Sequence, residues 1–318
     1  MTTESEYEAI LDRKKHKQDF DEHFADVKKL LQDIVNYGSN LMPRCFVSSE
    51  RKLEDAIIIG VLLRQVVAMV DAAEVLISNA AVYSSQLQAR AGFEASIYIE
   101  WILKRDTEKK AKYFYVSNLR KDKLWAQRTT GESPDQSQFD EMAQELSSQF
   151  IEKTDEMKEE AKNQIEEIDQ LLASTIYNDI NNEFQIYKNN RGLPYEPSWY
   201  APLGIPSVRQ MAIDVGRLPE YEFFYSLTSE VMHSSRYRHH IQFSEGKLIF
   251  EPIRSLKGIK MLINFIVACT LRTYMNILKH YRHGELPAFS RKYVEDWRIA
   301  FRSVKSVRYS PGSESTTI

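Results

Sequence analysis

Apolar residues recur at intervals of three and four along most of the chain, and this spacing places them on one face of an α-helix. Only 11 glycines and 10 prolines occur among the 318 residues, so long uninterrupted helices are expected. The pattern therefore predicts an all-α fold, a multi-helix bundle, with helices over residues 6–35, 50–79, 81–105, 107–128, 138–173, 176–188, 207–216, 219–240, 255–281 and 290–307.

Two short apolar runs after residue 240 have the character of strands. Residues 241–243 and 248–250 are rich in β-forming side chains, and they flank the turn-forming residues 244–247, Ser-Glu-Gly-Lys. We therefore expect one small β-hairpin beside the helices.

Breaks in the helical pattern predict the organisation of the chain. Gly38 and Asn40 predict an end to the first helix, and Pro43 predicts a turn before the second. We expect an N-terminal amphipathic helix over residues 1–45 and a helical core domain formed by residues 46–136 and 174–308. A long charged helix is expected over residues 137–173, and a disordered tail over residues 309–318.

Two of the predicted helices, residues 6–35 and 138–173, carry a narrow apolar seam among many charged residues. Such a seam is typical of a coiled-coil contact, and Thr154 is the polar residue that interrupts the second one. We expect the two helices to pair within the chain as a protruding hairpin. A homo-oligomer or a protein partner bound through the same seams is the alternative.

The most distinctive stretch is residues 219–240. Four polar or aromatic residues follow one another here at intervals of four: Tyr221, Tyr225, Ser229 and His233. On a helix, this spacing places them in a single stripe along one face. The opposite side is predicted to be apolar and covered, and it carries Phe223, Phe224, Leu227 and Val231.

Arg90 and Glu94 are the only charged residues between Ala81 and Ile99, and their spacing places them within an apolar and aromatic helix face. Two charges withdrawn from water lose solvation, and their mutual attraction offsets this loss only where further hydrogen bonds satisfy both groups. The pattern therefore predicts more polar partners nearby.

Three segments in this order resemble a known family: QARAGFEASIYIEWIL, WYAPLGIPSVRQMAIDVG and YEFFYSLTSEVMHSS. They are similar to the prokaryotic family catalogued as domain of unknown function 5677, in which an Arg-x-x-x-Glu helix precedes a Tyr-x-x-x-Ser-x-x-x-His helix. The resemblance covers about residues 53–278, interrupted by 138–173. It implies a helical bundle from a bacterial or phage-related source and no particular reaction, with the motif at Arg90, Glu94, Tyr225, Ser229 and His233.

We expect the two motif helices to face one another, so that Glu94 accepts a hydrogen bond from His233 or Tyr225, and Arg90 holds Glu94 or an anionic ligand. A structural network that fixes the register of the helices is one interpretation. A ligand or catalytic pocket is the other, because perturbed titrating groups also gather at functional sites.

Ser229 and His233 have the residue types of a nucleophile and its base, but the chain lacks the Gly-x-Ser-x-Gly turn that commonly presents a serine nucleophile.

A metal site is not expected. The residues able to ligate a metal show no His-Glu-x-x-His pattern and no zinc-site spacing; they are Cys45, Glu222, Glu230, His233, His239, His240 and Cys269.

A nucleic-acid contact has weak support. The Arg-x(4 to 6)-His signature of the helical HEPN ribonucleases is absent. What remains is a basic and aromatic patch that can contact phosphate and stack a base, formed by Arg236, Tyr237, Arg238, His239 and His240. Solvated residues at the entrance of the hairpin explain this patch equally well.

Composition adds the cellular setting. A formal net charge of -3 gives no global attraction to nucleic acid or to an anionic membrane. The N-terminus lacks the apolar region of a signal peptide, and the most apolar runs, 56–70 and 261–278, contain Arg64 and Arg272. We expect buried helices, a cytoplasmic protein, no membrane partner and no cofactor.

These observations predict a binding or effector role rather than a defined reaction, and they leave open whether the protein is an enzyme. Stress or phage defence is a setting suggested only by the bacterial source that the resemblance implies. The alternative is a metal-independent hydrolase or ribonuclease centred on His233.

Overall fold

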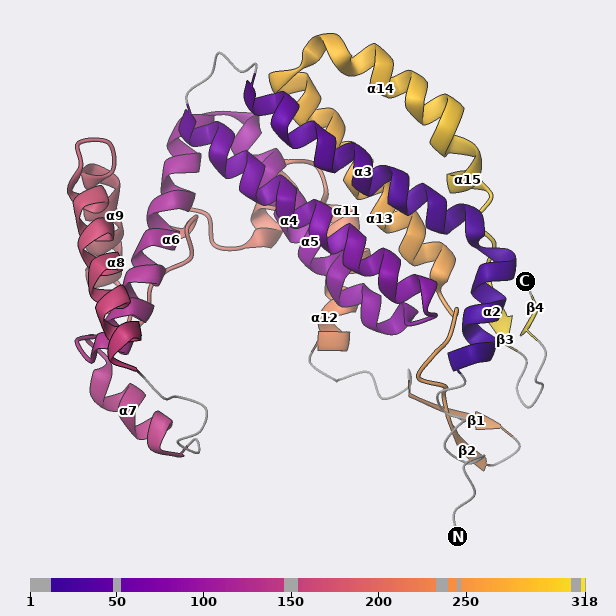
Figure 1. Ribbon diagram of the computed structural model, residues 1–318, viewed down its shortest axis with the longest axis horizontal. Helices are drawn as coiled ribbons and strands as arrows, with labels where there is room; N and C mark the ends of the chain where they lie inside the picture. Colours follow the sequence, from indigo (N-terminus) through magenta and orange to yellow (C-terminus); the bar gives the residue numbers. More distant parts are fainter. Residues whose placement is uncertain are drawn as a thin grey trace. The chain divides into compact units, whose positions relative to one another are not determined.

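The computed structural model describes residues 13–47, 53–145, 154–232, 240–244, 247–309 and 316–317. Most of these residues are helical, which confirms the predicted all-α class (Figure 1). The chain divides into two compact units: unit 1 contains residues 1–105 and 208–318, and unit 2 contains residues 106–207. The first seven residues of the predicted N-terminal helix lie outside the described residues.

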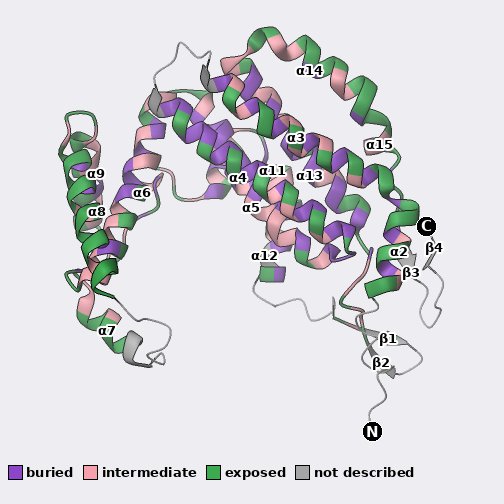
Figure 2. Ribbon diagram, viewed as in Figure 1, coloured by how far each residue is buried: buried purple, intermediate pink, exposed green. Residues whose placement is uncertain are grey.

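Unit 1 is built around four long helices. α4 (Leu53–Ser78) packs against α3 (Ala25–Val47) and α5 (Val82–Lys104), and α13 (Ile259–Tyr281) packs against α5 and α3. The short α2 (Arg13–His23) packs against α3 and α4. Buried positions concentrate along these helices, as their periodic apolar residues predict (Figure 2).

The predicted end of the first helix at Gly38 is wrong, because α3 continues through Gly38 and Pro43 to Val47. Gly38 serves close packing instead. A β-carbon at residue 38 would overlap the hydroxyl of Tyr274 and lie 2.6 Å from Cγ2 of Val67. The fully buried Tyr274 donates a hydrogen bond of 3.0 Å to the carbonyl of Ile34, so its ring is held against this helix.

The distinctive 219–240 stretch is not one regular helix. It comprises α11 (Leu218–Glu220), the π-helical turn η3 (Tyr221–Tyr225) and α12 (Ser226–Met232). The wider turn changes which side chains face inwards, because its hydrogen bonds run from residue i to i+5. Phe224 and Val231 are buried as predicted, but Phe223 is 76% exposed, so the prediction that it is covered is wrong.

The remaining elements of unit 1 are short. α10 (Val208–Asp214) and α12 pack against α5, while α15 (Arg298–Arg302) packs against α3. The C-terminal part consists of η5 (His283–Glu285), α14 (Leu286–Lys292), a second π-helical turn η6 (Tyr293–Trp297) and α15 (Arg298–Arg302).

Two short strand pairs occur in the described part of unit 1. β1 (Ile241–Ser244) pairs antiparallel with β2 (Lys247–Phe250), and Ile241 lies opposite Phe250. The turn of the predicted hairpin stays a prediction, because residues 245 and 246 lie outside the described residues. β3 (Arg308–Tyr309) pairs antiparallel with β4 (Thr316–Thr317).

Unit 2 is organised around α6 (Thr107–Thr130), which packs against both α8 (Asp155–Ala173) and α9 (Asn178–Asn190). The pairing of the 138–173 seam with the N-terminal helix stays a prediction; within this unit α8 packs against α6. A hydrogen-bonded network joins Arg120 on α6 to Glu196, at 2.6 Å, and to Asn181 on α9, also at 2.6 Å. The short η2 (Ala201–Leu203) completes the unit.

The predicted continuous helix over residues 138–173 is wrong. α7 (Gln136–Glu145) and α8 are separate elements, and residues 146–153 lie outside the described part. Thr154, the polar interruption of the seam, has an extended backbone, and its hydroxyl accepts a hydrogen bond of 3.2 Å from the backbone N–H of Met157. Thr154 is therefore an N-cap that begins α8.

Two helices of the described chain are long and apolar enough to cross a membrane, namely residues 55–78 and 259–281. More than half of each apolar window is buried inside the protein, at 56% and 61%. This degree of burial is also typical of a core helix in a soluble protein, so length and composition alone decide nothing about a membrane.

We predict that Gly38→Ala lowers the free energy of unfolding by about 1 to 3 kcal/mol, the usual effect of overpacking a core. Urea denaturation of the variant and the wild type measures the change. Gly284→Ala is the matched control, because a β-carbon there meets nothing within 4 Å. Equal stabilities of the two variants would contradict the packing role of Gly38.

Candidate functional site

Three of the five predicted site residues meet on α5 and η3. The hydroxyl of Tyr225 donates a hydrogen bond of 2.9 Å to Oε2 of Glu94, and Tyr98 donates one of 2.6 Å to Oε1. Both carboxylate oxygens are therefore occupied by phenol donors. We call Arg90, Glu94, Tyr98, Tyr221 and Tyr225 the tyrosine cluster.

Arg90 contacts this cluster through its charge rather than through a carboxylate. Its guanidinium carbon lies 4.1 Å from the centroid of the Tyr225 ring, which is a cation–π contact. Its Nη1 atom is buried and has no hydrogen-bond partner among the described residues. The contact that joins Arg90 to the cluster is therefore its stacking on the Tyr225 ring.

The π-helical turn arranges the two tyrosines of η3. The rings of Tyr221 and Tyr225 stack with centroids 4.7 Å apart and planes 22° apart. Burial, together with the charge of Glu94, raises the pKa of Tyr225 to about 12. The phenol therefore stays protonated and remains a donor at neutral pH.

Of the other predicted site residues, only His240 has a described side chain. Ser229 belongs to α12, and its side chain is not described. His233, Arg236, Arg238 and His239 lie outside the described residues, so their predicted roles stay predictions. His240 is described: its Nε2 lies 3.3 Å from the hydroxyl of Tyr83.

A second polar group, missed in the sequence, lies deeper in unit 1 and centres on Arg217. This side chain is 0% exposed. Its Nη1 donates hydrogen bonds of 2.8 Å to Oε1 of Glu100 and 2.9 Å to Ser96, and its Nη2 donates one of 2.8 Å to Sγ of Cys269. α5 and α13 are thereby joined through one buried cation.

The charge of Arg217 is balanced within a group of four. Glu100 also accepts from Arg272, at 3.0 Å, and Glu220 lies 3.4 Å from Arg217 and 3.6 Å from Arg272. Burial opposes the charge of Arg217, but the carboxylates of Glu100 and Glu220 outweigh it and raise its pKa. Burial also raises the pKa of the Cys269 thiol to about 12, so this sulfur is neutral. We call Glu100, Arg217, Glu220 and Arg272 the buried ion network.

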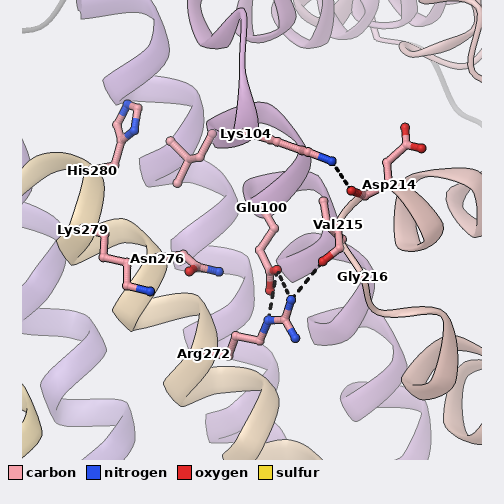
Figure 3. Close-up of a pocket in the computed structure, with 10 residues that line it drawn as sticks. Glu100, Lys104, Asp214, Val215, Gly216, Arg272, Asn276, Lys279 and His280 are labelled. Atoms are coloured by element: carbon pink, nitrogen blue, oxygen red, sulfur yellow. Dashed lines mark hydrogen bonds and ion pairs between the residues drawn. The ribbon is translucent and has the colours of Figure 1, made fainter.

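Two members of the ion network, Glu100 and Arg272, line a cleft of about 600 Å³ in unit 1 (Figure 3). Such a volume is typical of small-molecule sites. α5 contributes one wall, α13 another, and the end of α10 a third. The cleft is lined by Glu100, Leu103, Lys104, Asp214, Val215, Gly216, Arg272, Asn276, Lys279 and His280.

Two lysines and the carboxylate of Asp214 carry charge in this cleft beside the Glu100–Arg272 pair. Lys104 donates to the backbone carbonyl of Asp214, and Lys279 forms no ion pair or hydrogen bond with the described residues. The Asp214 carboxylate accepts from neutral donors, 3.2 Å from Nε1 of Trp101 and 3.1 Å from Nε2 of Gln210. It points away from the Glu100–Arg272 pair (Figure 3). Neither lysine is therefore paired directly with a carboxylate of the described chain.

The described residues of this cleft can bind an anion. The carboxylates of the tyrosine cluster and the ion network are already paired. Among the described residues, no three His, Cys, Asp or Glu side chains gather so as to hold a metal ion. The site can hold a ligand through its lysines and through the side-chain amide of Asn276.

Comparison with family models matches residues 55–248 to DUF5677, described as a family of unknown function. The chain belongs to this family. The match includes the tyrosine cluster and, within the ion network, Glu100, Arg217 and Glu220, whereas Arg272 and Lys279 lie beyond it. Searches of curated proteins and of solved structures find no match. The match therefore confirms the family that the sequence resembles. Because the function of that family is unknown, the match assigns no reaction to this chain.

We predict that Glu100→Gln lowers the free energy of unfolding by about 3 kcal/mol, because it leaves the Arg217 charge buried without its nearest carboxylate. Urea denaturation measures this loss. Glu222→Gln is the matched control: Glu222 pairs with Arg209 at 2.7 Å, but the two side chains are 43% and 51% exposed. That change is expected to cost less than about 1 kcal/mol. Equal losses would contradict the role of the buried network.

We also predict that Glu94→Gln lowers the pKa of Tyr225 from about 12 towards the ordinary value of 10.0, because a negative neighbour is removed while burial persists. NMR of protein labelled at the tyrosine Cζ carbon measures the titration, and Tyr225→Phe identifies the signal. Because the folded-state pKa of Tyr225 lies above the ordinary value of 10.0, the contribution of the protonated phenol to stability is complete below about pH 10 and is lost as the pH rises through the folded pKa. An unchanged Tyr225 titration in Glu94→Gln would argue against the contact.

Proposed function

We propose that this protein binds a small organic anion, carrying a phosphate or carboxylate group, in the cleft of unit 1. The observation that carries the proposal is the pair of lysines, Lys104 and Lys279, which face the cleft without a carboxylate partner in the described chain. A cleft walled by protein strengthens their attraction for an anion relative to the same charges in open water.

The ion network supports this role by keeping the floor of the cleft rigid. Arg272 is 35% exposed, and it is held by Glu100, by Glu220 and by the carbonyl of Val215 at 3.0 Å. Its guanidinium is therefore positioned before a ligand arrives, which reduces the entropy lost on binding. Glu100 and Glu220 balance Arg217 and Arg272, and the Asp214 carboxylate balances one of the two lysines, so one excess positive charge remains in the cleft to select an anion.

The tyrosine cluster has a structural role in this proposal. Glu94 is satisfied by Tyr98 and Tyr225, so it fixes η3 against α5 rather than awaiting a substrate. A binding role suits an effector in stress or phage defence, and that setting stays a prediction, as do the cytoplasmic location and the lack of a membrane partner. The hydrolase or ribonuclease alternative also stays a prediction, since it depends on His233.

We predict that inorganic pyrophosphate or citrate raises the melting temperature of the wild type by about 3 to 6 °C at ten times its dissociation constant. Lys279→Ala should weaken binding about tenfold, the usual scale for a charged hydrogen bond. Isothermal titration calorimetry measures the affinity, which should fall as salt is added.

Lys260→Ala is the matched control, because Lys260 lies on the same helix as Lys279, is exposed, and does not line the cleft. It should bind both probes as the wild type does. The proposal is wrong if neither anion binds the wild type, or if the two lysine variants bind equally well.

A further inference from the structure

One face of α4 is exposed although the rest of the helix is buried. Ile57, Val61 and Val75 are 48%, 55% and 52% exposed, so the expectation of a buried helix applies only to the other faces of α4. The exposed face follows steps of four and three, which is the seam spacing of a coiled coil. We call it the α4 stripe, and it consists of Ile57, Val61, Arg64, Ala68, Asp71 and Val75.

Two opposite charges lie in the middle of this stripe. Arg64 and Asp71 are exposed, and neither forms an ion pair or hydrogen bond with the described residues. They are seven residues apart on one helix, a rise of about 10 Å, so they cannot pair with each other. Ala68 lies between them.

We propose that the α4 stripe binds the α4 stripe of a second copy of this chain, with the two helices antiparallel and the two-fold axis close to Ala68. In that arrangement each Arg64 lies beside the second copy's Asp71, and the pair occurs twice because an isologous contact repeats itself. Ile57 and Val61 of one copy then approach Val75 of the other, and the small side chain of Ala68 permits close approach at the axis.

The residues argue for a second copy over an unrelated partner. The stripe carries apolar residues at both ends, Val61 and Val75 seven positions either side of Ala68, and charges of opposite sign between them. An antiparallel copy places apolar residues beside apolar residues and each charge beside its opposite. A parallel copy would instead place like charges together, and polar seam residues are known to select orientation in this way.

The size of the contact sets its strength. A helix of 26 residues is about 39 Å long, and a single-helix contact buries less than the roughly 800 Å² per partner of a standard interface. We therefore expect a dimer with a dissociation constant in the micromolar range. The dimer is independent of ligand binding in the cleft, so either proposal can fail without the other.

Lipid is the competing occupant, because residues 55–78 are long and apolar enough to cross a membrane. The two charges in the centre of the exposed face oppose this, since a charged side chain in the bilayer interior is costly. The experiment therefore includes vesicles as one of its arms.

The test is sedimentation equilibrium of the full chain from about 1 to 100 μM, a range that brackets a micromolar equilibrium. The wild type should dimerise. R64E and D71R should each dimerise at least tenfold more weakly, because each places like charges together twice. The exposed Lys260→Glu change on α13 is the matched control and should dimerise like the wild type, and circular dichroism checks that all variants fold.

Mixing R64E with D71R gives the decisive result. In the mixed dimer both contacts regain opposite charges, so the two variants should associate with each other at near wild-type affinity, as should the double variant R64E/D71R with itself. A monomeric wild type, or a mixture that associates no better than its components, would overturn the proposal. So would a monomeric wild type that cosediments with phosphatidylcholine vesicles, an outcome that assigns the stripe to lipid.

Discussion

A guanidinium that is fully withdrawn from water must be satisfied by the protein, and Arg217 imposes this requirement on unit 1. Ser96 and Glu100 on α5 and Cys269 on α13 all supply acceptors within 2.9 Å of it. The two helices and the turn before α11 are therefore fixed to one another at a single point. The cleft exists in its present form because this point also holds Arg272.

The same network connects the cleft to the tyrosine cluster through the chain itself. Glu220, which contacts both arginines, directly precedes the π-helical turn η3. That turn presents Tyr225 to Glu94. A π-helical turn is costly relative to a regular helix and is often found at functional sites, so its position between the two polar groups is consistent with a need for defined geometry.

Helical periodicity predicts most of the fold, and the isolated charges predict that Arg90 and Glu94 meet Tyr225. The ion network could not be read in the same way. Glu100 lies one residue beyond the apolar run that drew attention to Arg90, and Arg217 follows Gly216 in a segment that looks like a solvated loop. Arg272 stood out as a charge in an apolar helix, which was the available signal. Gly38 looked like a helix end because close packing against Tyr274, 236 positions away, leaves no local pattern.

The central claim is that Arg217 and Glu100 stabilise the fold as a coupled pair. A double-mutant cycle on this pair tests it most directly, with urea denaturation of Glu100→Gln, Arg217→Met and the double variant. The account predicts that the double variant is more stable than Glu100→Gln alone, by about 1 kcal/mol or more, because no buried charge is then left unpaired. Losses that simply add would contradict it.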